Sequence, residues 1–199
     1  MKIEIVTLDG NFVRLEPLSL DKHFDDLCAV GLDEDLWRWT VDQPRTVEKL
    51  HKYFEMALDE QAKQTALIFA TIEKSSNKAV GSTRFGAISA ENKRVEIGWT
   101  WIGRAWQRTF VNTEAKFLML EHAFEIWHCN RVELKTDAFN ERSRNAILRL
   151  GATQEGILRK HVITASGRIR DTVYFSILDE EWPQVKADLQ TKLKKETVK

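Results

Sequence analysis

The fold is decided by residues 95–115, which read VEIGWTWIGRAWQRTFVNTEA. This segment runs from a predicted strand that ends at Ile102, through a glycine-containing loop, directly into a predicted helix. Because the first amides of a helix have no acceptor within the helix, they point at whatever occupies the preceding loop. The order strand, loop, helix therefore predicts an anion-binding site. The alternative is an ordinary connection between a strand and a helix, capped by Asn112 or Thr113.

Before this segment, the spacing of apolar residues changes from a strand period to a helix period and back to a strand period. This pattern predicts two helices and a β-meander. The expected elements are a strand at Phe12–Leu18, a helix at Ser19–Gly31, a helix from its cap Thr46 to Lys63, and antiparallel strands at Thr65–Ile72, Ala79–Ile88 and Arg94–Ile102.

The chain after this segment continues as a mixed α/β pattern, and we expect one domain over residues 1–199. The expected elements are a helix at Asn112–Ile126, a strand at Arg131–Thr136, a helix at Asn140–Leu150 closed by Gly151, and a hairpin of Ile157–Thr164 with Arg168–Leu178. Pro183 ends the sheet, and the Lys-rich tail at about residues 185–199 is predicted as a frayed surface helix.

Overall charge and cysteine content exclude several classes of protein. The 199 residues contain 30 Lys and Arg against 30 Asp and Glu, so we expect neither nucleic-acid nor membrane binding. Cys28 and Cys129 lie far apart in a chain without an apolar leader, which favours a cytoplasmic protein over a secreted one. No apolar run approaches the roughly 18–20 residues that a membrane span requires. No His, Cys or carboxylate cluster has metal-ligand spacing, so no metal is expected.

Charge is nevertheless uneven along the chain. Residues 16–35 carry seven acids and one lysine, whereas residues 141–170 carry seven basic residues and two acids. The basic stretch is either a docking site for an anionic ligand or a solvated face that pairs with the acidic front.

The order of these elements resembles the GCN5-related N-acetyltransferase (GNAT) superfamily, in its RimJ/RimL-like branch. The likeness runs from Phe12 to Trp182 and includes Asn140, which lies eleven residues before Gly151. The superfamily motif Q/R-x-x-G-x-G/A falls on residues 107–112, where Gln107 fits the first position. Phe110 and Asn112 depart from the motif, because small residues are usual there.

The resemblance implies a central mixed, mostly antiparallel sheet flanked by helices, with a splayed strand pair that holds acetyl-CoA. The pyrophosphate of acetyl-CoA would lie on the loop residues. The pantetheine arm would lie along the strand that ends at Trp101 and Ile102, beside Asn140. The implied loop contacts are Gln107, Arg108, Thr109, Phe110, Val111, Asn112 and Thr113.

The resemblance also implies catalytic residues. The position where relatives often place a Tyr that protonates the thiolate is Ile147, so we expect the hydroxyl of Ser143 to take that part. Ser143 would otherwise be a first-turn cap. Glu96 is the candidate base, or else an exposed strand residue paired to Arg94 or Arg131.

The implied activity is transfer of an acetyl group to a primary amine by direct attack on the thioester. The acceptor is a small-molecule amine or a protein N-terminus, and Trp37, Trp99 and His161 are its candidate contacts; each could instead be structural. The Asp-rich front suits a cationic acceptor. The alternative function is a catalytically silent acyl-CoA-binding module. A homodimer is left open.

Overall fold

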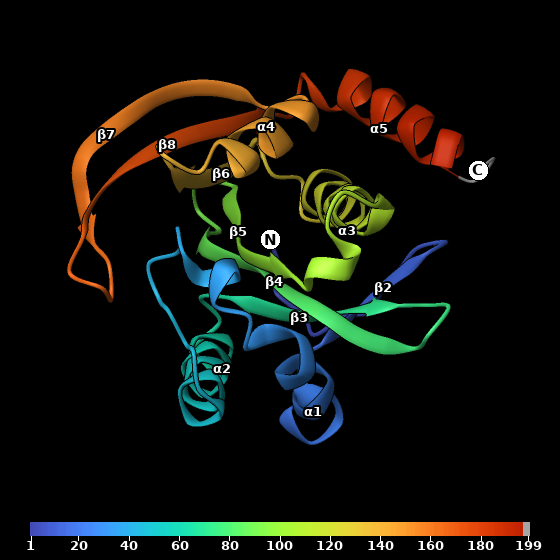
Figure 1. Ribbon diagram of the computed structural model, residues 1–199. Coiled ribbons are helices and arrows are strands. Elements are labelled where there is room, and N and C mark those ends of the chain that lie inside the picture. The colour runs from blue at the N-terminus through green and yellow to red at the C-terminus, as the bar shows by residue number, and fades with distance from the viewer. Residues whose placement is uncertain (197–199) are drawn as a thin grey trace.

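The computed structural model describes residues 1–196, which form one eight-stranded sheet with helices on both faces (Figure 1). The strand order is β1-β2-β3-β4-β5-β6-β8-β7, and only β5 and β6 run parallel. The strands are β1 (Leu8–Asp9), β2 (Val13–Pro17), β3 (Leu67–Glu73), β4 (Lys78–Ser89), β5 (Arg94–Ile102), β6 (Arg131–Asp137), β7 (Thr153–Ile163) and β8 (Ile169–Leu178). The expected fold class is confirmed.

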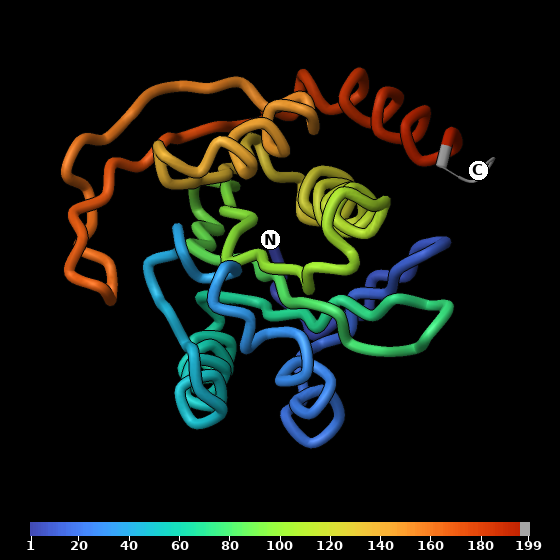
Figure 2. Tube along the Cα trace, in the orientation of Figure 1, coloured from blue at the N-terminus to red at the C-terminus, as the bar shows by residue number. Residues whose placement is uncertain are grey.

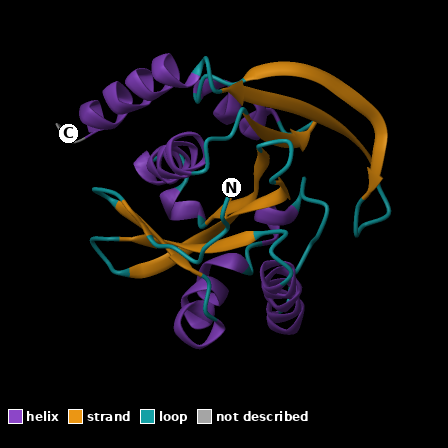
Figure 3. Cartoon of the chain, turned by 180° about the vertical axis from the view of Figure 1, so that it is seen from behind, coloured by secondary structure: helices purple, strands orange, loops and turns teal. Residues whose placement is uncertain are grey.

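The helices divide between the two faces of the sheet, as Figures 1 and 3 show from opposite sides. Helices α1 and α2 lie against one face of the β2–β5 half, and α3 lies against the other. The helices are α1 (Leu20–Gly31), α2 (Val47–Ala62), α3 (Phe110–Glu121), α4 (Glu141–Arg149) and α5 (Trp182–Glu196), with short turns η1 (Glu34–Trp37), η2 (Arg104–Trp106) and η3 (His122–Ile126). The predicted cap of α2 is confirmed, since the Thr46 hydroxyl accepts from the amide of Lys49.

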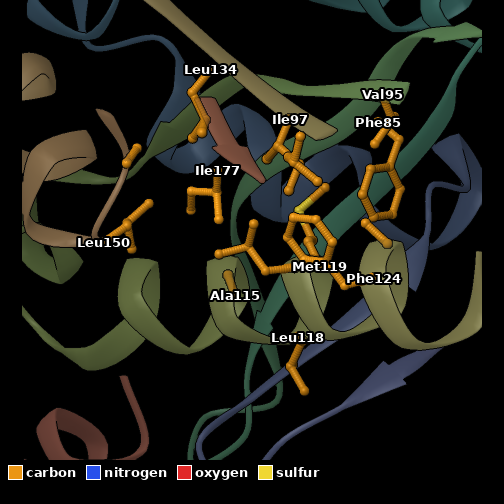
Figure 4. Packing of buried hydrophobic residues seen from close by; sticks show 14 of the residues in the cluster. Phe85, Val95, Ile97, Ala115, Leu118, Met119, Phe124, Leu134, Leu150 and Ile177 are labelled. Atoms are coloured by element: carbon orange, nitrogen blue, oxygen red, sulfur yellow. The ribbon is translucent and has the colours of Figure 1, made fainter. Parts of the chain in front are cut away.

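Two hydrophobic cores lie on opposite faces of the sheet. The larger one packs α3 side chains such as Ala115 and Met119 against Phe85, Ile97 and Leu134 of the strands (Figure 4). The smaller one packs α1 and α2 against the same strands through residues that include Leu27, Phe54 and Trp101. The central strands β3, β4 and β5 are therefore covered on both faces, which fixes their register.

Three sequence-based expectations need correction. The third helix begins at Phe110 and is capped by Thr109, so neither Asn112 nor Thr113 is the cap. Its last turn, from His122, is a π-helix. The tail is not frayed within the described residues, because Val185 and Leu189 are buried against the core of which α3 is part. The predicted end of this tail, residues 197–199, lies outside the described part of the chain.

The long β7–β8 hairpin leaves the body of the sheet as an arm (Figure 2). Its tip returns to the loop that follows η1, where the amide of Ala165 donates to the carbonyl of Val41 at 2.9 Å. The acidic front, by contrast, finds its partners elsewhere: Asp33 and Asp35 bind Arg104. Within residues 1–196, no ion pair joins the acidic front to the basic stretch, so the pairing of the two that the sequence left open is wrong.

Candidate functional site

Strands β5 and β6 separate after only three paired residues on each strand, of which Glu96 opposite Glu133 is the last. On its other side, β5 carries a bulge in which Trp99 and Thr100 oppose the single residue Thr83 of β4. Trp99 has a φ of 50°, in the left-handed region that non-glycine residues rarely adopt. A bulge bends its strand. It therefore accounts for the divergence of β5 from β6.

A cavity of about 720 Å³ occupies the gap between the diverging strands. Most of the residues proposed from the sequence line it, namely Trp37, Glu96, Trp99, Trp101, Ile102, Gln107, Arg108, Thr109, Asn112, Asn140, Ser143 and His161. Three proposed loop residues, Phe110, Val111 and Thr113, do not. The ring of Phe110 lies 4.4 Å from that of Phe12, away from the cavity, which explains how a large residue replaces the usual glycine.

One end of the cavity is formed by the loop before α3 and the start of α4. Gln107 joins them, because its amide nitrogen donates to the carbonyl of Ile102 at 2.9 Å and its oxygen accepts from Arg142. Arg108 has a φ of 63°, so the loop turns through a left-handed residue just before Thr109. The guanidinium groups of Arg108 and Arg142 and the first amides of α3 give this end a positive potential.

Helix α4 is capped by Asn140, whose side-chain oxygen accepts from the amide of Ser143 at 3.1 Å. The hydroxyl of Ser143 has no hydrogen-bond partner among residues 1–196, and Ser143 lines the cavity. Ile147, on the next turn, also lines the cavity and offers no proton. The cap that the sequence left open for Ser143 therefore belongs to Asn140.

The opposite end of the cavity is aromatic and charged. Glu96 is 8% exposed, and its Oε2 lies 2.8 Å from Nζ of Lys135, so its partner is neither Arg94 nor Arg131. Burial acts to lower the pKa of Lys135, but the hydrogen bond and charge of Glu96 outweigh it, and the net pKa is raised. Oε1 of Glu96 has no hydrogen-bond partner in the described part of the chain.

The aromatic candidates differ in what they can still bind. Trp37 is buried and donates its indole N–H to the carbonyl of Gly31 at 2.6 Å, so it can offer only its ring. Trp99 is 38% exposed and stacks on the guanidinium of Arg84, 4.4 Å from the ring centroid. His161 is exposed and lies edge-on to Tyr174 at 5.8 Å.

Sequence reasoning missed two cationic residues that line the cavity, Lys116 and Lys135; a third, Arg170, belongs to the basic stretch that the sequence offered as an anion-docking site. Lys116 of α3 is buried, and its Nζ donates to the hydroxyls of Thr83 and Thr100 beneath the bulge. Burial lowers the pKa of Lys116 to about 7. For Lys116, the available signal was a lysine inside an otherwise apolar stretch of helix. For Lys135, strand alternation indicated Glu133 as its neighbour on the same face and gave no sign of Glu96.

Within residues 1–196 the structure contains no group of three His, Cys, Asp or Glu side chains that could hold a metal ion. No helix in that range is long and apolar enough to cross a membrane.

Comparison with known proteins shows which family the chain resembles. The family model described as "Acetyltransferase (GNAT) domain" matches residues 13–153. The uncharacterised N-acetyltransferase p20 of Bacillus licheniformis is 29% identical over 159 residues, which are 79% of this chain and 88% of p20.

Two solved structures extend the comparison to the fold. A GCN5-related N-acetyltransferase from Brucella melitensis is 34% identical, with a TM-score of 0.89 over 96% of this chain and 86% of its own. The RimJ of Mycobacterium smegmatis, solved in complex with CoA-disulfide, shares the fold at 21% identity, with a TM-score of 0.77 over 90% of this chain and 88% of its own.

Proposed function

The chain belongs to the GNAT acetyltransferase family, and on that premise we propose that it transfers an acetyl group from acetyl-CoA to a primary amine. The observation that carries the proposal is that one cavity between β5 and β6 joins a positively charged end to an end that holds a carboxylate. A two-substrate transfer needs both ends to open onto one space, because the amine must reach the thioester directly.

The positively charged end of the cavity, at the start of α3, fits the pyrophosphate of the donor. The N-terminus of α3 carries amides without intrahelical acceptors and the positive end of the helix dipole. Arg108, Arg142 and Arg149 line the same end and add charge. Because Phe110 turns its ring toward Phe12, the large side chain that departs from the motif does not enter the cavity.

The edge of β5 beyond Glu96 fits the pantetheine arm. This edge has lost its β6 partner, so its backbone groups are available to pair with the amides of the arm. Asn140 lies across the cavity with its oxygen occupied by Ser143, and its Nδ2 has no partner within residues 1–196. That nitrogen is free to donate to a carbonyl of the arm.

Glu96 accepts the proton of the attacking amine in this proposal. An ammonium has no lone pair, so a base must remove its proton before attack. Lys135 holds Oε2 of Glu96, Oε1 has no hydrogen-bond partner among residues 1–196, and Glu96 lines the cavity. At the other side of the scissile bond, the unpartnered hydroxyl of Ser143 donates a hydrogen bond to the departing thiolate.

The test is incubation of the purified chain with acetyl-CoA and panels of small amines and peptides, followed by CoA release and mass spectrometry of the acceptors. The expected result is CoA release that depends on an amine, with a product 42 Da heavier, the mass added when acetyl replaces hydrogen. Tight calorimetric binding of acetyl-CoA with no acetylated amine in either panel would contradict the proposal and favour a silent binding module.

A further inference from the structure

The face of β5, β6 and β8 that points away from α3 carries a ladder of alternating charges. Charged residues of β5 and β6 on this face pair with one another, with Glu155 of β7 or with Arg168 in the turn before β8, and each acid has a basic partner. The pairs are Arg94 with Glu133, Arg131 with Glu133 and Glu155, Lys135 with Glu96, and Arg168 with Asp137. Such pairing is expected where charges are drawn partly out of water.

Arg170 is the exception in this ladder. Its Nε donates to the hydroxyl of Thr172 at 3.1 Å, and Oδ2 of Asp137 lies 3.9 Å from the same nitrogen. Asp137 is already bound to Arg168 and to the amide of Phe139. The two terminal nitrogens of Arg170 make no hydrogen bond to any of residues 1–196, although the side chain is only 10% exposed.

The unpartnered terminal nitrogens of Arg170 can bind an anionic ligand. Arginine carries five N–H donors in a planar fork that matches a carboxylate in bidentate geometry. Burial lowers the pKa of Arg170, but an arginine remains protonated at neutral pH. The terminal nitrogens of Arg170 are not among the fully buried atoms that lack a partner, so they are accessible, and because Arg170 lines the cavity an acceptor there can reach them.

The local charge balance favours an anion at this end. Two cations that line the cavity here, Lys135 and Arg170, face one buried carboxylate, Glu96, whereas Arg168 and Asp137 pair with each other outside its lining. The other acid that lines the cavity, Asp42, is exposed. None of the acidic front at residues 16–35 lines the cavity, so its charge does not select a cationic acceptor there.

The tip of the β7–β8 hairpin and the loop after η1 meet beside this end of the cavity. The hydrogen bond from Ala165 to Val41 ties the tip of the β7–β8 hairpin to the loop after η1, and Arg168 lies 5.3 Å from the ring of Trp39.

We propose that the acceptor is an amine that carries its own carboxylate, with Arg170 binding the carboxylate while the amine faces Glu96. This inference rests on the proposed acetyl transfer. The same chemistry is offered by the α-carboxylate of a free amino acid and by an acidic side chain at a peptide N-terminus.

The experiment compares amines that differ by one carboxylate, with acetyl-CoA as donor. Tryptophan is paired with tryptophanamide, and a peptide amide that begins Asp-Ala is paired with one that begins Asn-Ala, which separates the two sources. The wild-type chain should prefer the acid of at least one pair by about 10- to 100-fold in kcat/KM, the range expected for a charged hydrogen-bonded pair.

The matched variants are Arg170→Gln, Arg170→Lys and the control Arg159→Gln, an exposed residue of β7 that does not line the cavity. Arg170→Gln should reduce the preference at least tenfold, Arg170→Lys less, and Arg159→Gln not at all. A ratio within one variant is unaffected by partial misfolding. No wild-type preference, or a preference that survives Arg170→Gln, would overturn the inference.

A binding measurement distinguishes failure of this inference from failure of the proposed function. If the wild-type chain acetylates none of the four amines, the proposed acceptor chemistry fails, and melting curves with the same four compounds still decide the role of Arg170. A shift in Tm with the acid of a pair, lost in Arg170→Gln, supports carboxylate binding. Equal shifts with the acid and its amide contradict it.

Discussion

The side-chain oxygen of Asn140 accepts the backbone amide of Ser143 across 3.1 Å, and so caps α4 without any help from the Ser143 hydroxyl. That hydroxyl consequently faces the cavity with no partner among residues 1–196. Capping, which the sequence could not separate from the proposed chemistry at Ser143, is carried by Asn140, and the Ser143 hydroxyl is left available for that proposed chemistry.

Ser143→Ala should therefore slow turnover without weakening the fold. Loss of the donor to the thiolate should lower kcat by about 10²-fold, as removal of a general acid commonly does. The melting temperature should stay close to that of the wild type, because the cap remains, and CoA affinity should change little. Calorimetry, CoA-release kinetics and a melting curve of the same preparation test all three. Wild-type kcat in Ser143→Ala would remove Ser143 from the mechanism.

Arg108 allows backbone strain and phosphate binding to be separated. Its φ of 63° is one that glycine adopts without cost, whereas other residues lose about 1–2 kcal/mol. Arg108→Gly should keep or raise stability, and it should weaken CoA by removing a cation from the phosphate end. Arg108→Ala removes the same charge without relief of strain, so it should bind CoA equally weakly and melt at a lower temperature. Equal melting of the two variants would show that the turn carries no strain.

The sequence predicts most of the elements because local patterns dictate them. The β-branched and aromatic runs of β3 and β4, the Thr46 cap and the Asn140 position all depend on residues close together in the chain. The cap at Thr109 was missed because the loop offers several capping residues, and only the packing of Phe110 on Phe12 selects one.

The site was predicted less completely, since its charges pair across strands far apart in the sequence. Glu96 was expected beside Arg94 or Arg131, yet those two arginines bind Glu133. The strand register, and the end of β5–β6 pairing, bring Lys135 to Glu96 instead. Arg170 comes from β8, and no local pattern near Glu96 indicates it.

Glu96→Gln should lower turnover at neutral pH by about 10²- to 10⁴-fold, the usual contribution of a general base. The loss should shrink as pH rises toward the pKa of the acceptor amine, because the amine then deprotonates without help. The measurement is a pH profile of kcat/KM for wild type and variant. A constant ratio across pH would contradict the assignment of Glu96 as base.

The matched control is Glu133→Gln. Glu133 occupies the same face, opposite Glu96 in the strand register, and is equally buried, but it does not line the cavity. Its loss breaks the ion pairs with Arg94 and Arg131 and the longer 3.9 Å contact with Lys135, so it should lower stability. The pH profile of kcat/KM for Glu133→Gln should keep the shape of the wild-type profile. A change in that shape would be expected only if Glu133 took part in proton removal.

Lys116 should make stability rise with pH, and Lys116→Met should abolish that rise. Burial lowers its pKa from 10.5 to about 7 in the folded chain, and the unfolded chain keeps the ordinary value. Between these two values the unfolded state binds one more proton than the folded state, so unfolding becomes less favourable as pH increases. Below about pH 7 both states are protonated and the penalty is constant, at several kcal/mol by about 1.4 kcal/mol per pKa unit.

Methionine is close to lysine in length and carries no charge. In Lys116→Met the hydroxyls of Thr83 and Thr100, 2.8 Å apart, still bond to each other, so no buried group is orphaned. Urea unfolding at pH 7 and pH 9 should show the variant more stable than the wild type, by a margin that narrows at pH 9. Lys52→Met, on the exposed face of α2, controls for other titrating groups and should show no such margin. A margin for Lys116→Met that does not change with pH would mean that Lys116 is charged in the folded chain, and the two threonine hydroxyls would then be solvating an ammonium beneath the bulge.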